Sequence, residues 1–316
     1  MLATGSSPII PPIPGLDALD GLWPNREASE IREVPDRLLV LGGGPVGVEM
    51  GQAVHRLGAS VALVEGANRV LSREPEPLGE ALGEALEADG IELHLGQDPS
   101  AARRQGEGYE LEFPEGPSLR GDRLLVATGR RPRVEGIGLE TVGISTGKRG
   151  ELPVDSHMRA GDDVWAIGDV TGIWPLTYVG KYQGRVAAAN ILGEEREANY
   201  VVPRVIFTDP QVASVGDADG PLTATVKLAE VPRTSTYMRE YEDRPYFLTL
   251  VSDGERLTGA YALGPEAGEW LGQATLAIRA KTPLELLNDL IQPFPTFSEA
   301  YLYGLLDLTS RTPAPV

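Results

Sequence analysis

The sequence contains no cysteine among its 316 residues. A thiol nucleophile, an internal redox disulfide and a thiolate metal site are therefore excluded within this chain. Basic residues are also scarce, because 28 Lys and Arg stand against 46 Asp and Glu, for a formal net charge of −18. Proteins that bind nucleic acid present a basic face to its phosphates, so no nucleic-acid partner is expected.

Long apolar runs are missing as well. No stretch approaches the roughly 18–20 apolar residues of a membrane span, and residues 1–5 lack the basic and apolar regions of a signal peptide. His55, His94 and His157 are far apart and lack metal-ligand spacing. We therefore expect a cytoplasmic protein without a membrane span or a metal site. Its length allows two or three domains of roughly 100–150 residues each.

A glycine-rich loop lies between a short apolar strand, 37–41, and a predicted helix, 46–57. In such a loop Gly42 permits the tight turn, Gly44 lets the backbone approach a pyrophosphate, and Gly47 lets helix and strand pack closely. Amide groups at the helix start then face the phosphates, and a proline in the first turn costs little there. The whole loop reads Gly42-Gly43-Gly44-Pro45-Val46-Gly47.

An acidic residue, Glu65, ends the next predicted strand, 61–64. Its carboxylate would accept hydrogen bonds from an adenosine ribose and repel a 2′-phosphate, which favours NAD over NADP. Arg69 and Arg73 follow nearby and weaken that preference. The alternative interpretation is a glycine-rich turn beside a solvated glutamate. We predict a dinucleotide site with a preference for NAD(H).

Further short motifs accompany the glycine loop in a fixed order along the chain. Together they resemble the pyridine nucleotide-disulfide oxidoreductase family, and the resemblance covers essentially the whole chain. It implies an α/β fold with a Rossmann-like NAD-binding domain, a partial FAD-binding domain and a C-terminal α+β dimerisation domain. The motifs are Ala3-Thr4-Gly5-Ser6, Ala127-Thr128-Gly129-Arg130, Ile167-Gly168-Asp169 and Pro295-Thr296-Phe297-Ser298-Glu299.

The resemblance also implies a division into domains and a homodimer. Residues 1–33 would be a remnant of the FAD domain and a linker, 34–129 the NAD-binding domain, 130–200 a second segment of the FAD domain, and 201–316 the interface domain, with a frayed tail from 311. In the family, an amino-terminal segment carries a first glycine loop for FAD and the redox cysteines. That segment has no counterpart in this sequence, so we expect a truncated chain or a separate FAD-binding polypeptide.

Several residues match flavin-side positions of the family. The resemblance implies that Asp169 binds the ribityl chain or its neighbouring phosphate region, beside Gly129, and that Thr177 begins a helix whose amides face the flavin. Glu49 matches a glutamate that pairs with a lysine near flavin N5. Two local alternatives remain open, since Asp169 is equally an aspartate that caps a helix and Glu49 an acid in a first helical turn.

The carboxyl-terminal motif departs from the family pattern His-x-His-Pro-Thr-x-x-Glu. Gln292 and Phe294 replace the two histidines, the second of which is the family's base for a dithiol. Phenylalanine cannot transfer a proton. Glu299 has therefore lost the partner that it orients in the family. We expect an acceptor that is not a thiol, such as a quinone or a second nicotinamide.

These observations lead to two functional hypotheses. The first is an NAD(P)H-dependent FAD flavoprotein oxidoreductase, in which hydride passes through the flavin to a small-molecule electron acceptor. The second is a catalytically silent module that binds NAD and dimerises, or one half of a two-chain flavoprotein. NADH binding without electron transfer would favour the second hypothesis.

Overall fold

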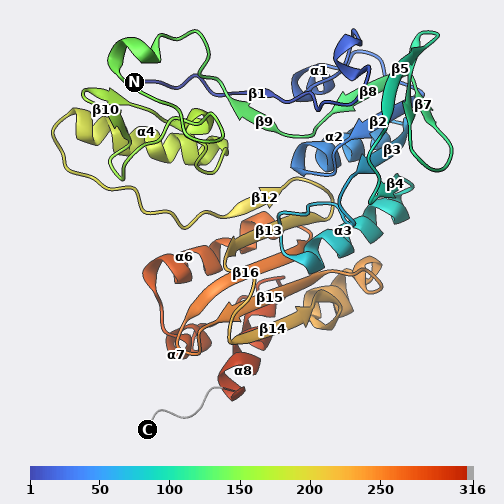
Figure 1. The fold of residues 1–316 in the computed structure, drawn as a ribbon. Helices are drawn as coiled ribbons and strands as arrows, with labels where there is room; N and C mark the ends of the chain where they lie inside the picture. The colour runs from blue at the N-terminus through green and yellow to red at the C-terminus, as the bar shows by residue number, and fades with distance from the viewer. Residues whose placement is uncertain (312–316) are drawn as a thin grey trace. The chain divides into compact units, whose positions relative to one another are not determined.

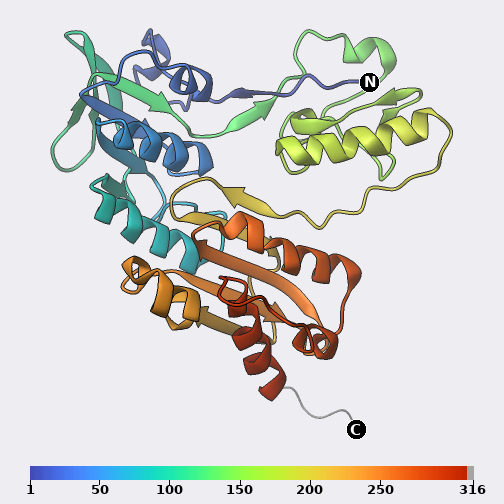
Figure 2. The ribbon, with the colours of Figure 1, turned by 180° about the vertical axis from the view of Figure 1, so that it is seen from behind.

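The computed structural model describes residues 1–311, so the predicted tail lies almost wholly outside the described residues. The chain forms two compact units, each built from two segments. The first unit contains Met1–Pro11 and Thr128–Val202, and the second contains Pro12–Ala127 and the chain from Pro203 onward. Figures 1 and 2 show their elements from opposite sides.

The second unit begins with a four-stranded parallel sheet. Its spatial order is β4-β3-β2-β8, which in chain order is the 3-2-1-4 arrangement of a doubly wound sheet. Three of the strands, β2, β3 and β8, are mostly buried, and Leu38, Leu39 and Val40 are fully buried, whereas the edge strand β4 is partly exposed. The strands are β2 (Arg37–Leu41), β3 (Ser60–Glu65), β4 (Glu92–Leu95) and β8 (Arg123–Val126).

Two helices connect these strands. α2 (Pro45–Arg56) contacts β2 and β3, as Figure 1 shows. α3 (Glu76–Asp89) turns Leu78, Leu82 and Leu86 inward, at the four-residue spacing of one helix face, and all three are fully buried. A short helix, α1 (Asn25–Ser29), precedes the sheet.

A three-stranded antiparallel sheet lies between β4 and β8 in the chain. Its strands are β5 (Ala101–Gln105), β6 (Gly108–Glu112) and β7 (Leu119–Gly121). Tyr109 and Leu111 share a hydrophobic cluster with Leu16 of the short turn η1 (Leu16–Ala18).

The rest of the second unit is a five-stranded antiparallel sheet, ordered β12-β13-β16-β15-β14. Helices α6 (Gly272–Ala280) and α8 (Glu299–Arg311) pack on it, the first against β13 and β16 and the second against β14 and β15 (Figures 1 and 2). The strands are β12 (Arg204–Ile206), β13 (Gln211–Gly216), β14 (Leu222–Lys227), β15 (Phe247–Ser252) and β16 (Leu257–Gly264). The short elements are η4 (Leu228–Glu230), η5 (Arg233–Tyr237), η6 (Arg239–Tyr241), α5 (Ala267–Trp270) and α7 (Leu284–Asn288).

The first unit is smaller and has little regular structure besides its helix, α4 (Thr177–Ile191). Two antiparallel strand pairs complete it, with the turns η2 (Leu139–Val142) and η3 (Gly168–Thr171). The pairs are β1 (Ser6–Pro8) with β9 (Arg130–Pro132), and β10 (Arg159–Gly161) with β11 (Val164–Trp165).

The elements confirm the predicted α/β class, with helices and sheets in alternation followed by an α+β region. Across residues 1–311, no helix combines the length and apolar character needed to cross a bilayer.

Candidate dinucleotide and flavin sites

The glycine loop follows β2 at the carboxyl edge of the parallel sheet, where open α/β sheets bind ligands. Gly42 has a φ of 109°, which favours glycine. A Cβ on Gly47 would lie 1.8 Å from the carbonyl oxygen of Gly42, so loop and helix could not approach each other this closely with any side chain there. A Cβ on Gly44 would meet no atom within 4 Å. The loop is therefore closed on its inner side and open beside Gly44.

The first amide groups of α2 donate no hydrogen bond to a capping side chain within residues 1–311. Pro45 is the first helical residue, and Val48 is the first whose N–H is bonded within the helix, to the Gly44 carbonyl at 3.1 Å. In the described part of the chain, no side chain caps this terminus. The amides of Val46 and Gly47 and the helix dipole thus favour an anion beside the open loop.

Glu65 is fixed by two backbone amides. Its Oε2 accepts a hydrogen bond from the Gly43 N–H at 2.7 Å, and its Oε1 accepts one from the Ala67 N–H at 2.9 Å. Each carboxylate oxygen has more than one acceptor position, so both can still accept from a ribose hydroxyl. The loop and the acid are therefore held together before any ligand binds.

Arg69 and Arg73, which follow Glu65, differ in burial and in hydrogen bonding. Arg69 is half-buried and its Nη1 donates to the carbonyl of Leu71 at 2.9 Å, while the Leu71 amide donates to the carbonyl of Gly43. Arg69 therefore supports the loop through the backbone. Arg73 is exposed. Of the two, only Arg73 keeps a guanidinium without a structural hydrogen bond within residues 1–311.

Glu49 lies in the second turn of α2 and is half-buried. Its Oε1 accepts a hydrogen bond from the backbone N–H of Phe207 at 2.7 Å. Burial raises the pKa of the Glu49 carboxyl, and the Phe207 amide opposes that shift by stabilising the charged form. This contact occupies only Oε1 of Glu49, so Oε2 is left for the lysine that the resemblance implies.

Sequence reasoning missed that Glu49 is one of three side chains on α2 that hold the same loop. Gln52 donates to the carbonyl of Asp209 and accepts from its N–H, both at 2.8 Å. Arg56 donates to the Asp209 carboxylate at 2.6 Å. Their spacing of three and four residues, which places them on one helix face, is the only signal in the sequence that could have grouped them.

The flavin-side motifs come together in the first unit. Asp169 is half-buried, and its Oδ2 accepts a hydrogen bond from the Ser6 hydroxyl at 2.6 Å. The Ser6 oxygen in turn accepts from Nε of Arg130 at 2.7 Å. Two other predicted motifs thus supply the partners of Asp169, so the carboxylate is part of a polar chain and does not simply cap a helix.

The turn before Asp169 is closely packed against α4. Gly168 has a φ of 76°, and its amide donates to the buried Oε1 of Gln183 at 2.6 Å. A Cβ on Gly180 would come within 3.3 Å of the Gly168 Cα. Asp169 is thereby held near the first turns of this helix.

α4 begins at Thr177, which is exposed, and no side chain among residues 1–311 caps this helix start. Gly129 has a φ of 134°, and its carbonyl accepts from the Ile9 amide at 3.0 Å. Thr177 thus stands at a helix start without a side-chain cap, while Gly129 joins the strand pair β1–β9.

The carboxyl-terminal motif forms a local cap. Oε2 of Glu299 accepts from the Thr296 N–H at 3.3 Å, and the Glu299 amide donates back to the Thr296 carbonyl. The ring of Phe294 is 65% exposed and meets Tyr237 edge-on. In the chain described, Glu299 therefore supports the start of α8.

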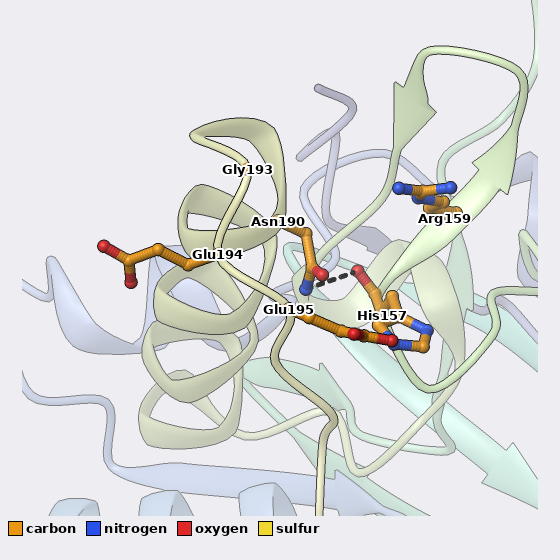
Figure 3. Close-up of a pocket in the computed structure, with 6 residues that line it drawn as sticks. All are labelled: His157, Arg159, Asn190, Gly193, Glu194 and Glu195. Carbon is orange, nitrogen blue, oxygen red and sulfur yellow. Dashed lines mark hydrogen bonds and ion pairs between the residues drawn. The ribbon is translucent and has the colours of Figure 1, made fainter.

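The three histidines, His55, His94 and His157, each have different neighbours. Both ring nitrogens of His55 face backbone carbonyls, and His94 lies beside Glu92. Over residues 1–311, no three His, Cys, Asp or Glu side chains gather closely enough to hold a metal. His157 lines a pocket of about 260 Å³, and its Nε2 lies 4.0 Å from Oε1 of Glu195. Figure 3 shows the residues around this pocket. The lining residues are His157, Arg159, Asn190, Gly193, Glu194 and Glu195.

The parallel sheet, the open glycine loop and the fixed acid define a dinucleotide-binding α/β protein. The loop fits NAD(H), because Gly44 leaves room for a pyrophosphate and Glu65 presents acceptors for a ribose. The polar chain through Asp169 fits a hydroxyl-bearing ligand such as the ribityl part of FAD.

Comparison with known proteins identifies the family. Residues 1–184 match the model of the pyridine nucleotide-disulphide oxidoreductases, and residues 202–303 match the dimerisation domain of the same family. The chain therefore belongs to the pyridine nucleotide-disulphide oxidoreductase family, as the motifs predicted. Members are NAD(P)H-dependent flavoprotein oxidoreductases that bind FAD, and the second match supports a homodimer.

Individual relatives agree with this assignment. A mercuric reductase of Streptomyces lividans is 37% identical over 98% of this chain and 68% of its own length. A dihydrolipoyl dehydrogenase of Thermus scotoductus is 34% identical over 96% of this chain and 68% of its own length. Among solved structures, LpdA from Mycobacterium tuberculosis is similar with a TM-score of 0.85 and 27% identity, over 97% of this chain and 68% of that one.

Proposed function

We propose that this chain is an NAD(H)-dependent FAD flavoprotein oxidoreductase with a non-thiol electron acceptor. The observation that carries the proposal is the loop open at Gly44, with Glu65 held beside it by two backbone amides. In this assignment Gly42, Gly44, Pro45, Val46 and Gly47 form the pyrophosphate cradle. Glu65 receives the adenosine ribose and disfavours a 2′-phosphate.

The flavin side rests on the first unit. Asp169, oriented by Ser6 and Arg130, would receive a ribityl hydroxyl, and the start of α4 at Thr177 would face the electron-rich edge of the ring system. Gly129 supports the adjoining backbone. Bound FAD supplies the electron-transfer chemistry, while these side chains and amides bind and orient it.

Glu49 is proposed as the flavin-side carboxylate. The Phe207 amide holds its Oε1, which fixes the side chain and leaves Oε2 for a further partner. Because burial raises the pKa of Glu49, a cationic partner there would be strongly favoured over an isolated carboxylate. In domain terms, we assign 34–129 to NAD binding, 1–33 and 130–200 to the flavin domain, and 201–316 to the interface.

The proposal of a non-thiol acceptor rests on the carboxyl-terminal motif. An exposed phenylalanine, Phe294, occupies the position of the family's proton-transferring histidine. Glu299 is used to cap its own helix. A quinone or a second nicotinamide needs neither a thiol nor that histidine.

The test is a visible absorption spectrum of the purified full chain, recorded after incubation with FAD and desalting. The proposal predicts retained flavin absorbance that NADH bleaches, and reoxidation by a quinone but not by lipoamide. Reoxidation by lipoamide alone would contradict the acceptor class. A colourless protein that still binds NADH would instead support the catalytically silent module, or a separate polypeptide that supplies the remaining FAD contacts.

A further inference from the structure

The segment after β4, residues 96–98, lies beside the segment that contains Glu65. β3 and β4 are parallel neighbours with Glu65 opposite Leu95, so both chains leave the sheet at the same edge. The amide of Gln97 donates to the carbonyl of Glu65 at 3.2 Å, and the amide of Gly96 donates to the carbonyl of Ala67 at 2.8 Å. These bonds fix the second segment against the proposed ribose site.

Asp98 brings a second carboxylate to this place. A Cβ on Gly66 would lie 2.6 Å from Asp98 Oδ1, so the carboxylate rests against the residue that directly follows Glu65. Asp98 is exposed and forms no hydrogen bond or ion pair with any other residue from Met1 to Arg311. Its negative charge is therefore uncompensated, whereas both oxygens of Glu65 already accept backbone amides.

We propose that Asp98 is a second specificity-determining residue of the dinucleotide site and acts with Glu65 to exclude the 2′-phosphate of NADP(H). The proposal rests on the proposed function, because it places the adenosine ribose at Glu65. Glu65 directly precedes Gly66 in the chain, and the Asp98 carboxylate rests against Gly66, so a phosphate at the ribose would stand near two negative charges. A hydroxyl at the same place meets only hydrogen-bond acceptors.

The two nearby arginines, Arg69 and Arg73, do not neutralise the negative charge of Glu65 and Asp98. Arg69 is turned to the Leu71 carbonyl, and its Cδ would lie 3.2 Å from a Cβ on Gly79, which packs it beside α3. Arg73 is exposed and is the remaining source of attraction for a phosphate. Its long side chain loses rotamer freedom on binding, whereas Asp98 is short and already placed.

The expected effect follows from Coulomb's law. A unit charge about 4 Å away in water-like surroundings changes affinity by about fivefold, and the two carboxylates should contribute separately. Asp98→Asn should therefore strengthen NADPH binding by about fivefold and leave NADH binding nearly unchanged. Glu65→Gln should act similarly on NADPH but weaken NADH, because it also changes the ribose acceptor. The double variant should combine the two gains for NADPH.

The experiment measures dissociation constants of NADH and NADPH by fluorescence titration, for the full chain and these three variants. Asp122→Asn is the matched control, because it removes the same charge at the opposite edge of the same sheet, just before β8. Each titration is repeated at about 0.02 M and about 0.5 M salt. Salt screening should reduce the Asp98→Asn effect, whereas a change caused by altered folding would persist.

The possible outcomes separate the two proposals. A fivefold gain for NADPH in Asp98→Asn, absent in Asp122→Asn and smaller at high salt, supports the inference. Wild-type binding of NADH with no change of NADPH affinity in Asp98→Asn overturns the inference alone, and the dinucleotide site stands. A wild-type chain that binds neither nucleotide overturns both the inference and the proposed NAD(H) site.

Discussion

Apart from Asp98, the residues proposed for the dinucleotide site lie in one continuous stretch, from Gly42 to Glu65. The flavin-side group instead joins Ser6, Arg130 and Asp169 from three separate segments. In the first region, a loop and a strand end bind each other through the Gly43 amide, 22 residues from Glu65. In the second, the bond from Ser6 to Asp169 spans 163 residues. The dinucleotide region therefore forms with local structure, while the flavin-side region exists only when the whole first unit is assembled.

Substitutions in the two regions should therefore affect different ligands. A substitution in the local loop should remove nucleotide binding or loosen one βαβ unit. A substitution in the long-range group should loosen flavin binding without any effect on NADH.

The strongest effect is expected at Gly47. A methyl group there would lie 1.8 Å from the Gly42 carbonyl, so Gly47→Ala must displace loop or helix and should cost about 3 kcal/mol of unfolding free energy. Urea titration of the full chain measures this loss. Gly44→Ala is the matched control, because its methyl meets nothing within 4 Å and the residue is extended, at φ −75°. Equal stability of both variants would contradict the closed loop.

The next largest effect is expected at Gln52, because this residue of α2 forms hydrogen bonds with a residue far along the chain. Gln52 is 3% exposed and bonds both the amide and the carbonyl of Asp209, 157 residues away. Gln52→Leu leaves these groups and the Asp89 carboxylate without that partner, and should lower the unfolding free energy by about 2 kcal/mol. Thermal unfolding provides the measurement.

The control for Gln52 is Arg56→Ala on the same helix face. The Arg56–Asp209 ion pair is largely exposed, so its loss should cost below about 1 kcal/mol. A larger loss for Arg56→Ala than for Gln52→Leu would show that charge, rather than the buried amide, holds loop 207–209.

A smaller effect is expected at Asp169 and should be confined to flavin. Asp169→Asn removes the charged acceptor, and we expect FAD affinity to fall about tenfold, which corresponds to about 1.4 kcal/mol. Ser6→Ala should reduce FAD affinity less, because it removes only the group that orients the carboxylate. Flavin retention after desalting and NADH titration together measure the separation.

Glu194→Gln, an exposed carboxylate in the same unit, should change neither affinity. If Asp169→Asn weakened NADH binding as much as FAD binding, the two regions would not be independent.

The last expected effect is present at neutral pH and is lost in acid. Glu110 on β6 is 1% exposed, and hydrogen bonds from Ser118, Arg103 and Arg120 lower the pKa of its carboxyl from 4.5 to about 2. A depressed carboxyl pKa stabilises the fold above the unfolded value, and this contribution is lost as pH falls from 4.5 towards 2. The wild type should therefore exceed Glu110→Gln in stability at neutral pH.

That advantage should shrink between about pH 4.5 and 2, as measured by urea midpoints at several pH values. Glu107→Gln, exposed between β5 and β6, is the control and should track the wild type throughout. A difference between wild type and Glu110→Gln that did not change with pH would contradict the lowered pKa.

Local elements could be predicted from the sequence because their signals are local. The strand at 37–41, the glycine loop and the helix after it occur as predicted, since apolar runs, glycine positions and a first-turn proline act over a few residues. Regular structure is shorter where distant segments pair, and β11 covers only Val164–Trp165. Ala166 pairs instead with Leu2 at an isolated bridge, and Gly168 turns the chain at a φ of 76°.

Contacts between distant side chains could not be predicted in the same way. Glu49 was assigned by resemblance, but its bond to the Phe207 amide depends on how α2 meets the turn after β12. Asp98 had no motif around it, and only the parallel pairing of β3 and β4 brings it beside Gly66. Contacts of this kind can be recognised only when the topology is known and two strand ends are seen to lie at one edge of a sheet.

The most direct test of the central claim is a calorimetric titration of NADH into the purified chain and into Gly44→Val. The open space beside Gly44 predicts saturable binding by the wild type, and loss of binding in a variant whose unfolding curve is unchanged. No binding by the wild type, or equal binding by Gly44→Val, would contradict a dinucleotide site at this loop.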